Sequence, residues 1–207
     1  MEWKLFDGAV PYASTFDFHK DRERAPHAEQ PIHQPRMKLA LNYVKFCDPD
    51  SVIDLGCGDG GFVQMLSNDR PWTRTTGFDF TPSNKDGWRE RGLEDKCFSA
   101  DVFPAPPGPV IDPGIELKLR DTDVAVMTEI LEHIARPHEA LAAIKSNYIV
   151  ASSPWGESDR SHDECHAWAW DMAGYRRLVE DAGFVIIDHQ KAGFSQVILA
   201  RRTQEVS

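Results

Sequence analysis

Short apolar runs alternate with segments of helical period along most of the chain, and this alternation restricts the fold more than any other feature. The runs expected to be strands are 49–58, 72–80, 96–103, 121–131, 147–154, 184–190 and 195–202. The segments expected to be helices are 34–47, a segment beginning at 61, and 82–92, 138–146 and 171–184, the last ending at Gly183. Strands that alternate with helices predict an α/β fold, in which helices cover both faces of a mostly parallel sheet. The last two strands are expected to be antiparallel neighbours.

Composition and charge narrow the functional classes. The 207 residues suffice for one domain with a large core, and we expect an N-terminal arm or lid over 1–35, irregular to about residue 30, and a main domain over 36–207. No apolar run approaches the length of a membrane span, and the N-terminus lacks the apolar core of a signal peptide, so we expect a cytoplasmic protein without a membrane partner. The net charge of −10 counts against a nucleic-acid partner without excluding one. The four cysteines contain no C-x-x-C pair, which favours free thiols.

The stretch "SVIDLGCGDGGF" at 51–62 joins a strand to a helix through a glycine-rich turn. In an open α/β sheet, ligands bind at the carboxyl ends of the strands, and glycines let the backbone approach them closely. Gly56, Gly58 and Gly61 also satisfy the nicotinamide pattern G-x-G-x-x-G. However, the carboxylates of Asp54 and Asp59 would lie beside the pyrophosphate of such a cofactor, which is unfavourable. They suit a ligand with cationic groups, such as the sulfonium and ammonium of S-adenosylmethionine.

The segment "DLGCGDG" resembles the first motif of the class I S-adenosylmethionine-dependent methyltransferases, acid-x-G-x-G-x-G, and "GFDF", "SADVF" and "VMTEILEHI" are similar to that family's later motifs in order. The resemblance covers about 45–200. It implies a Rossmann-like fold with a seven-stranded, mostly parallel sheet and S-adenosylmethionine as cofactor. In that family an acid at Asp79 would hold the ribose hydroxyls, and Asp101 and Val102 would lie near the adenine. The implied cofactor-binding residues are Asp54, Gly56, Cys57, Gly58, Gly60, Asp79, Phe80, Asp101, Val102 and Thr128.

Two segments supply carboxylates and histidines. "TEILEHI" is expected to place Glu129, Glu132 and His133 at the start of a helix, where positions i, i+3 and i+4 lie on one face. "SHDECHAWAW" adds His162, Glu164 and His166. If this later loop folds over the end of the fourth strand, carboxylates and imidazoles could surround a divalent cation.

This second pattern resembles the metal-dependent methyltransferases of small-RNA 3′-terminal 2′-hydroxyls, which have E-x-x-E-H and a later histidine before an aromatic pair. That resemblance implies Glu129, Glu132, His133 and His166 as metal ligands. The same "LEH" is also similar to ubiquinone-biosynthesis O-methyltransferases, which use no metal. In a metal-free site His133 or His166 would act as general base and Glu129 would line the reacting end.

The acceptor pocket is expected to have aromatic walls, from Trp155, Trp168 and Trp170 on one side and Tyr12, Phe16 and Phe18 on the other, with ordinary packing as the alternative for each tryptophan. We therefore expect methyl transfer from S-adenosylmethionine to an oxygen or nitrogen nucleophile, with a small-molecule acceptor favoured. The alternatives are a metal-dependent RNA 2′-O-methyltransferase, a cofactor-binding regulatory protein without activity and, least favoured, a nicotinamide oxidoreductase. The oligomeric state stays open.

Overall fold

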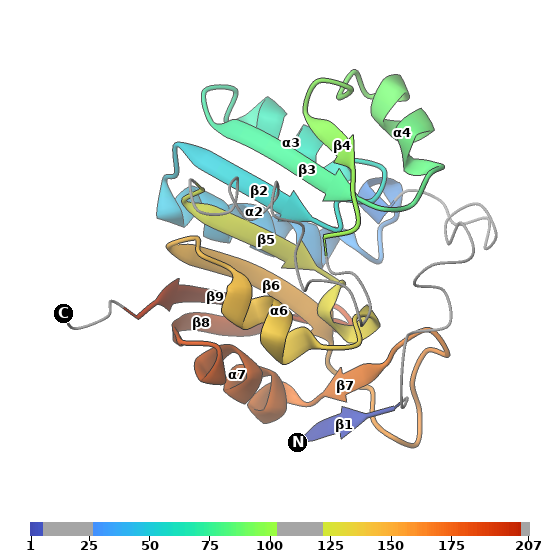
Figure 1. Cartoon of the computed structure of the whole chain (residues 1–207), viewed down its shortest axis with the longest axis vertical. Helices are drawn as coiled ribbons and strands as arrows, with labels where there is room; N and C mark the ends of the chain where they lie inside the picture. Colours follow the sequence, from blue (N-terminus) through green and yellow to red (C-terminus); the bar gives the residue numbers. More distant parts are fainter. Residues whose placement is uncertain (6–26, 103–121, 204–207) are drawn as a thin grey trace.

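A computed structural model of the chain describes residues 1–5, 27–102 and 122–203 (Figure 1). The proline-rich segment at 104–114 and the aromatic residues Tyr12, Phe16 and Phe18 of the expected pocket wall lie outside these described residues. Within the described ranges, no helix is both long enough and apolar enough to cross a membrane.

The described strands form one large sheet that matches the predicted architecture. Its members are β2 (Ser51–Leu55), β3 (Arg74–Asp79), β4 (Cys97–Ser99), β5 (Val124–Thr128), β6 (Tyr148–Pro154), β8 (Phe184–Ala192) and β9 (Ser195–Arg202). In the part of the chain that the structure describes, this sheet has seven strands in the order β4-β3-β2-β5-β6-β9-β8. All neighbours are parallel except β9, which runs antiparallel to both β6 and β8. The strand order reverses between β2 and β5, so a ligand site is expected at their carboxyl ends.

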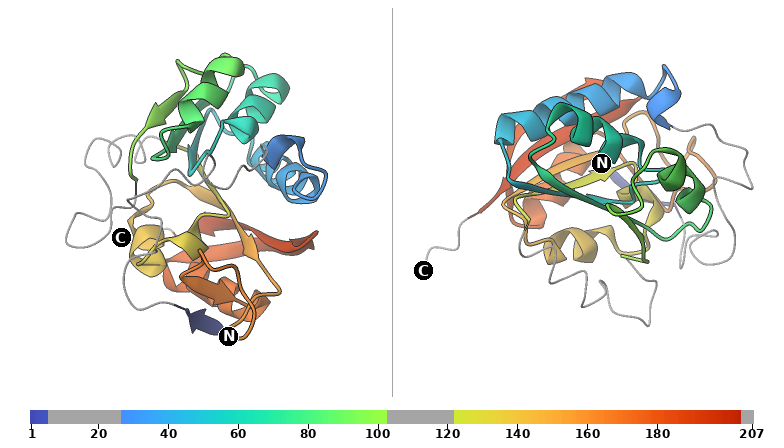
Figure 2. Two further views of the ribbon diagram at one scale, coloured as in Figure 1. Left: turned by 90° about the vertical axis from the view of Figure 1, so that its right-hand side faces the viewer. Right: turned by 90° about the horizontal axis from the view of Figure 1, so that it is seen from above.

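Helices cover both faces of this sheet, as Figures 1 and 2 show. The helices α2 (Gln34–Cys47) and α3 (Gly61–Asp69) pack on one face, and α6 (Pro137–Ala143) and α7 (Met172–Asp181) pack on the other. A shorter helix, α4 (Asn84–Glu90), lies near β4. The bounds of α2 equal the predicted ones because its apolar residues recur every three or four positions, burying Met37, Ala40 and Val44.

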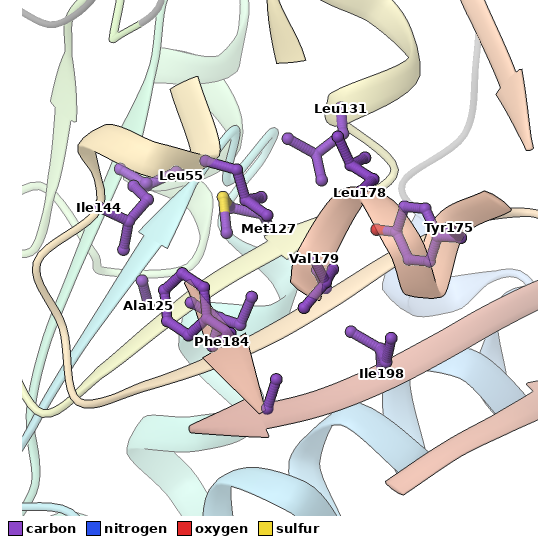
Figure 3. Close-up of a cluster of buried hydrophobic side chains, with 14 of the residues drawn as sticks. Leu55, Ala125, Met127, Leu131, Ile144, Tyr175, Leu178, Val179, Phe184 and Ile198 are labelled. Atoms are coloured by element: carbon purple, nitrogen blue, oxygen red, sulfur yellow. The ribbon is translucent and has the colours of Figure 1, made fainter. Parts of the chain in front are cut away.

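The core has a layer on each side of the sheet. The larger layer, drawn in Figure 3, packs Met127 of β5 and Ile198 of β9 against Leu178 and Tyr175 of α7. The continuous burial of β2, β5 and β6 follows from helices covering both of their faces, which is why these strands have no polar alternation in the sequence.

A separate two-stranded sheet corrects the prediction of an irregular N-terminal arm. Strand β1 (Glu2–Lys4) pairs antiparallel with β7 (Trp168–Trp170), and the carboxylate of Glu2 accepts a hydrogen bond of 2.7 Å from the indole N–H of Trp170. A short 3-10 turn, η1 (His27–Glu29), also lies inside the predicted arm. The sequence did not reveal β1 because a three-residue strand depends on its distant partner for its hydrogen bonds.

Replacing Gly174 by alanine is expected to lower the melting temperature, although alanine is the better helix former. Gly174 lies in α7, and a Cβ there would be 1.9 Å from the carbonyl oxygen of Met1, next to β1. Overpacking of this kind costs about 1–3 kcal/mol, which corresponds to roughly 2–10 °C for a chain of this length. Thermal unfolding of Gly174→Ala should be compared with Gly156→Ala, whose added Cβ meets no atom within 4 Å. Equal melting temperatures for the two variants would contradict this docking of β1.

Candidate active site

The predicted cofactor residues follow the carboxyl ends of neighbouring strands, where the loops of a parallel sheet meet. They are Asp54 in β2, Gly56, Cys57, Gly58 and Gly60 after β2, Asp79 and Phe80 at the end of β3, Asp101 and Val102 after β4, and Thr128 at the end of β5. Phe80 and Thr128 are partly exposed, Asp101 is exposed, and Val102 is buried in the larger core layer. The fold therefore places the whole predicted set along one edge of the sheet, on both sides of the switch point.

The glycine turn has a backbone that side chains would disturb. Gly56, Gly58 and Gly60 have φ values of 77°, 54° and 83°, in the left-handed region that favours glycine. A Cβ on Gly56 would lie only 2.8 Å from Cδ1 of Ile130. The N–H groups of Gly56 and Cys57 both donate to the carbonyl oxygen of Phe78, which fixes the turn against β3.

Asp54 is a buried carboxylate that lacks a complete set of partners. It is 1% exposed, and within the described residues its Oδ1 accepts no hydrogen bond. Burial and, second, the charge of Asp79 raise the pKa of Asp54 to about 7, while the guanidinium of Arg36 partly offsets both. A buried polar atom without a partner calls for a ligand group, and a cationic donor such as an ammonium fits this carboxylate.

Asp79 is held in place by the backbone around it. Its Oδ2 accepts from the N–H of Gly58 at 2.9 Å, and its Oδ1 accepts from the N–H of Thr81 and the side-chain amide of Asn84, each at 2.8 Å. A carboxylate offers about four acceptor positions, so Oδ2 keeps capacity for a hydroxyl of a ligand.

Asp59 was expected to disfavour a pyrophosphate through its negative charge, but a neighbouring cation offsets that charge. Its Oδ2 pairs with Arg91, whose Nε lies 3.1 Å away, and Arg91 also contacts Glu29 at 2.9 Å. Because the guanidinium offsets its charge, Asp59 cannot be counted among the acids that disfavour a pyrophosphate. Of the two acids in that argument, only Asp54 has no such cation at hydrogen-bonding distance among the residues that the structure describes.

A cluster of Glu132, His133 and His166 lies beyond the ends of β5 and β6. One ligand atom from each residue lies within 4.8 Å of the others. Glu132 is 1% exposed, and neither of its carboxylate oxygens accepts a hydrogen bond from another described residue. Burial and the nearby charge of Glu129 raise the pKa of Glu132 well above its usual value. Burial and the neighbouring His166 hold the pKa of His133 well below its usual value.

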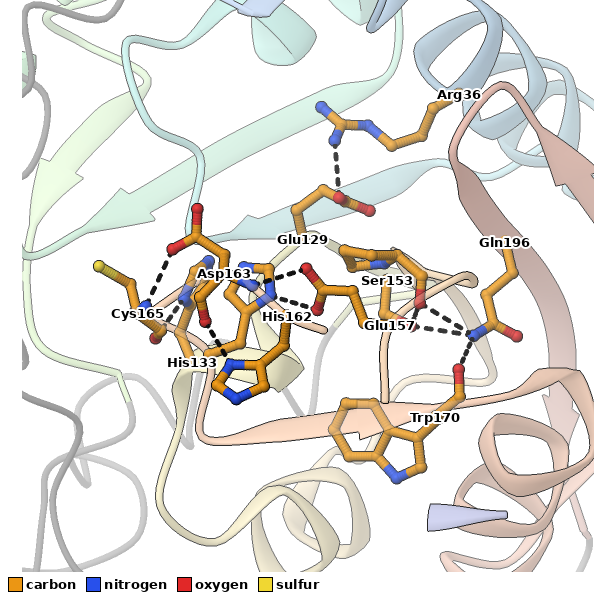
Figure 4. A network of polar contacts seen from close by, with 12 residues as sticks. Arg36, Glu129, His133, Ser153, Glu157, His162, Asp163, Cys165, Trp170 and Gln196 are labelled. Atoms are coloured by element: carbon orange, nitrogen blue, oxygen red, sulfur yellow. Dashed lines mark hydrogen bonds and ion pairs between the residues drawn. The ribbon is translucent and has the colours of Figure 1, made fainter. Parts of the chain in front are cut away.

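The contacts of the two histidines define which ring nitrogen carries the proton. Nδ1 of His133 lies 3.2 Å from the carbonyl oxygen of Cys165, and Nδ1 of His166 lies 2.6 Å from Oε2 of Glu157. Since a carbonyl and a carboxylate oxygen accept, each Nδ1 donates, and in the neutral form of either ring Nε2 would carry the lone pair. Figure 4 shows this network and its position beside Glu129. Metal-binding histidines have the same kind of outer partner.

Glu129 lies outside this cluster, and the prediction of a helix there is wrong. The residues form a short 3-10 turn, η2 (Leu131–His133), and Glu129 precedes it with a φ of 55°. Its Oε2 lies 3.3 Å from Nη1 of Arg36, as Figure 4 shows. Its Oε1 accepts from the hydroxyl of Ser152 at 2.8 Å. Glu129 therefore points to α2, and the three residues of "TEILEHI" do not share one helical face.

The later loop contributes one residue to the cluster. His166 is buried there, whereas His162 and Glu164 are exposed. The aromatic wall is also only partly as expected: Trp170 is fully buried in the core, so its prediction as a pocket wall is wrong.

The other two tryptophans differ in their surroundings. Trp168 is half-buried and stacks parallel to Trp170, with 6.1 Å between ring centroids. Trp155 is 36% exposed, and Nζ of Lys191 lies 3.3 Å from its ring centroid.

Two site residues were missed in the sequence. Arg36 is 2% exposed, and its Nε and Nη1 have no hydrogen-bond partner in the described residues, although Nη1 pairs electrostatically with Glu129. The sequence could have pointed to Arg36, because this residue lies on the same apolar face of α2 as Ala40 and Tyr43, where a charged side chain is unusual. Glu157 gave no signal, because only the folded loop brings it to His166.

Residues 24–189 match a family described as a methyltransferase domain. No curated protein matches the chain.

Solved structures share the fold at low identity. An O-methyltransferase family protein from Burkholderia thailandensis is 14% identical with a TM-score of 0.66, and the match covers 91% of this chain but 62% of that one. The methyltransferase domain of a bacterial CtHen1 is 15% identical with a TM-score of 0.62, covering 84% of this chain and all of the other. Human N-acetylserotonin methyltransferase in complex with SAM is 18% identical with a TM-score of 0.61, covering 82% and 52%.

Proposed function

The chain belongs to the methyltransferase-domain family and is an S-adenosylmethionine-dependent methyltransferase, and we propose that it methylates a hydroxyl of a small molecule. The acceptor would bind beside Glu132, His133 and His166. The observation that carries this proposal is the buried carboxylate of Glu132, which accepts no hydrogen bond from any other described residue and lies beside two imidazoles. A buried acid in this state is costly unless a ligand satisfies it. The chain's acidity and its likeness to O-methyltransferases support a small-molecule acceptor.

In this proposal the cofactor supplies a methyl group on a cationic sulfur, and the chain's residues bind the rest of it. Asp54 would accept from the ammonium, and Asp79 would accept from the ribose hydroxyls. Arg36 would bind the carboxylate, since it offers buried N–H groups that lack acceptors in the described part of the chain. Asp101 and Val102 would lie near the adenine, as the family motif implies. Residues 1–35 would form the arm beside the main domain.

The three clustered residues would hold a divalent cation. One carboxylate and two imidazoles suit Mn²⁺ or Zn²⁺, and Mg²⁺ less well. A cation there would bring the acceptor hydroxyl closer to deprotonation. Glu157 would keep His166 in the required tautomer by accepting from its Nδ1. Glu129 would not be a ligand, because Arg36 and Ser152 hold its carboxylate.

Replacing His166 by alanine is expected to weaken Mn²⁺ binding at least tenfold and to remove methyl transfer, because it deletes one of three ligands. His162→Ala is the matched control, since His162 belongs to the same loop but lies exposed and outside the cluster. Calorimetric titration of Mn²⁺ into both variants, with adenosylhomocysteine in excess, makes the comparison. If the wild-type chain binds no divalent cation and stays active with a chelator, His133 or His166 acts as a metal-free general base instead.

A second candidate acceptor is the 3′-terminal ribose of an RNA. The observation in its favour is that Glu132, His133 and His166, three residues of the pattern that resembles RNA 2′-O-methyltransferases, lie together. The net charge of −10 disfavours it, because RNA binding depends on neutralising phosphates. Incubation with labelled cofactor and either a pool of hydroxylated small molecules or short RNAs distinguishes the two acceptors. Methylation of the RNA would favour this candidate if periodate oxidation of the RNA's 3′-terminal diol, carried out before the incubation, prevents it.

A further inference from the structure

We infer that Trp88 is a positioning residue for the cofactor turn, because its indole N–H fixes the orientation of the peptide between Gly58 and Asp59. Trp88 lies in α4 and is 3% exposed, and its Nε1 donates to the carbonyl oxygen of Gly58 at 2.8 Å. None of the four motifs that carry the family resemblance contains this residue. The inference depends on the cofactor alone and not on the acceptor or a cation.

The peptide in question is the central one of a tight turn. The N–H of Gly60 donates to the carbonyl oxygen of Cys57 at 3.0 Å, which closes a four-residue turn with Gly58 and Asp59 in the middle. Gly58 has a positive φ of 54° and Asp59 does not have a positive φ, as in a type II′ turn. A flip of the central peptide would convert this turn to type I′, which requires a positive φ at Asp59. Aspartate tolerates that conformation, so the turn needs another contact to hold one orientation.

Trp88 provides that contact from one side of the turn, and Asp79 holds Gly58 from the other. Oδ2 of Asp79 accepts from the N–H of Gly58 at 2.9 Å, so this residue is bound through both its N–H and its carbonyl. The indole itself is fixed by packing, since Trp88 belongs to a buried cluster with Cys57, Leu93 and other apolar residues. A Cβ on Gly60 would lie 3.2 Å from Cδ1 of Trp88, which shows how closely the ring underlies the turn.

The orientation matters because the two groups of a trans peptide point in opposite directions. With the carbonyl of Gly58 directed at the indole, the N–H of Asp59 points away from the buried cluster. Within the described residues this N–H makes no hydrogen bond. It is therefore available to an oxygen of the cofactor, whose ribose and carboxylate are both acceptors. A flipped peptide would present a carbonyl oxygen there and repel those same oxygens.

The test replaces the indole N–H while keeping the ring. Site-specific incorporation of β-(3-benzothienyl)alanine at position 88 exchanges N–H for sulfur with little change of shape. We expect the dissociation constant for adenosylhomocysteine to rise about tenfold, the effect of one hydrogen bond of about 1.4 kcal/mol, without a matching fall in melting temperature. Trp88→Phe should weaken binding to a similar extent, and Trp72→Phe, which alters a tryptophan that is 70% exposed, should not.

A backbone signal distinguishes positioning from mere packing. In the wild-type chain the amide ¹H–¹⁵N resonance of Asp59 is expected to move on titration with adenosylhomocysteine, and in both position-88 variants this shift should shrink. If the benzothienyl variant binds within twofold of the wild type, or if the Asp59 resonance does not respond to the ligand in the wild type, Trp88 has no positioning role.

Discussion

Asp54→Asn is expected to weaken binding of adenosylhomocysteine at pH 8 by about 100-fold or more and, in the same chain, to raise the melting temperature. The loss of affinity follows because the substitution removes the buried carboxylate proposed to bind the cofactor's ammonium, and truncating one partner of such a pair costs 2–5 kcal/mol or more. The gain in stability follows because Asp54 is buried and its Oδ1 has no hydrogen-bond partner in the described residues. Calorimetry and thermal unfolding of both proteins measure the two effects.

The expected rise in melting temperature depends on pH, because the pKa of Asp54 differs between the folded and the unfolded chain. The pKa of Asp54 is raised from 3.8 to about 7 in the folded chain, so its contribution to the free energy of unfolding is fully present below pH 3.8 and is lost as the pH rises to 7. A shift of about three units corresponds to at most about 4 kcal/mol. The melting-temperature gain of Asp54→Asn should therefore be largest at pH 8 and shrink toward pH 4–5.

Cofactor affinity should depend on pH in the opposite sense. The ammonium pairs with the ionised carboxylate, so wild-type affinity should fall as the pH drops below about 7, and Asp54→Asn should lack this dependence. An Asp54→Asn protein that binds as tightly as the wild type would remove Asp54 from the proposed cofactor site. One that is less stable at pH 8 would contradict the burial cost assigned to this carboxylate.

Glu132→Gln is expected to abolish methyl transfer, by at least about a thousandfold, while stabilising the fold by about 1–3 kcal/mol. Activity is lost because the proposed cation and acceptor site loses its one carboxylate. Stability rises because a neutral amide avoids the cost of ionising or protonating a buried acid whose pKa is raised by burial and by Glu129. Single-turnover transfer of a labelled methyl group and denaturant unfolding test the two halves, and adenosylhomocysteine binding should be unchanged.

Glu129→Gln is the matched control, because it makes the same chemical change three residues away. Its side chain pairs with the buried guanidinium of Arg36, so the substitution leaves that cation without its anionic partner and should destabilise the fold by about 3 kcal/mol. The two variants are thus expected to change stability in opposite directions. A Glu132→Gln protein that is less stable than the wild type and keeps its activity would make Glu132 a structural residue.

Local patterns predicted much of this protein because they depend on short stretches of chain. The helical period of 34–47 gave the bounds of α2, and apolar runs gave the seven strands of the large sheet. The motif at 51–62 also indicated a tight glycine turn, and Gly56, Gly58 and Gly60 have the left-handed backbone that favours glycine. Strand β1 was missed because its hydrogen bonds come from β7, far along the chain.

The chemistry of the candidate site depends on which distant groups meet, and the sequence by itself could not decide that. It supplied the candidate carboxylates Glu129, Glu132 and Glu164 and the candidate histidines His133, His162 and His166. Tertiary packing brought together Glu132, His133 and His166. Arg36 draws Glu129 toward α2, just as Arg91 offsets the charge of Asp59. Periodicity along a chain fixes backbone conformation and burial, whereas the pairing of charges is a property of side chains brought together across the sheet, and only the tertiary structure sets those distances.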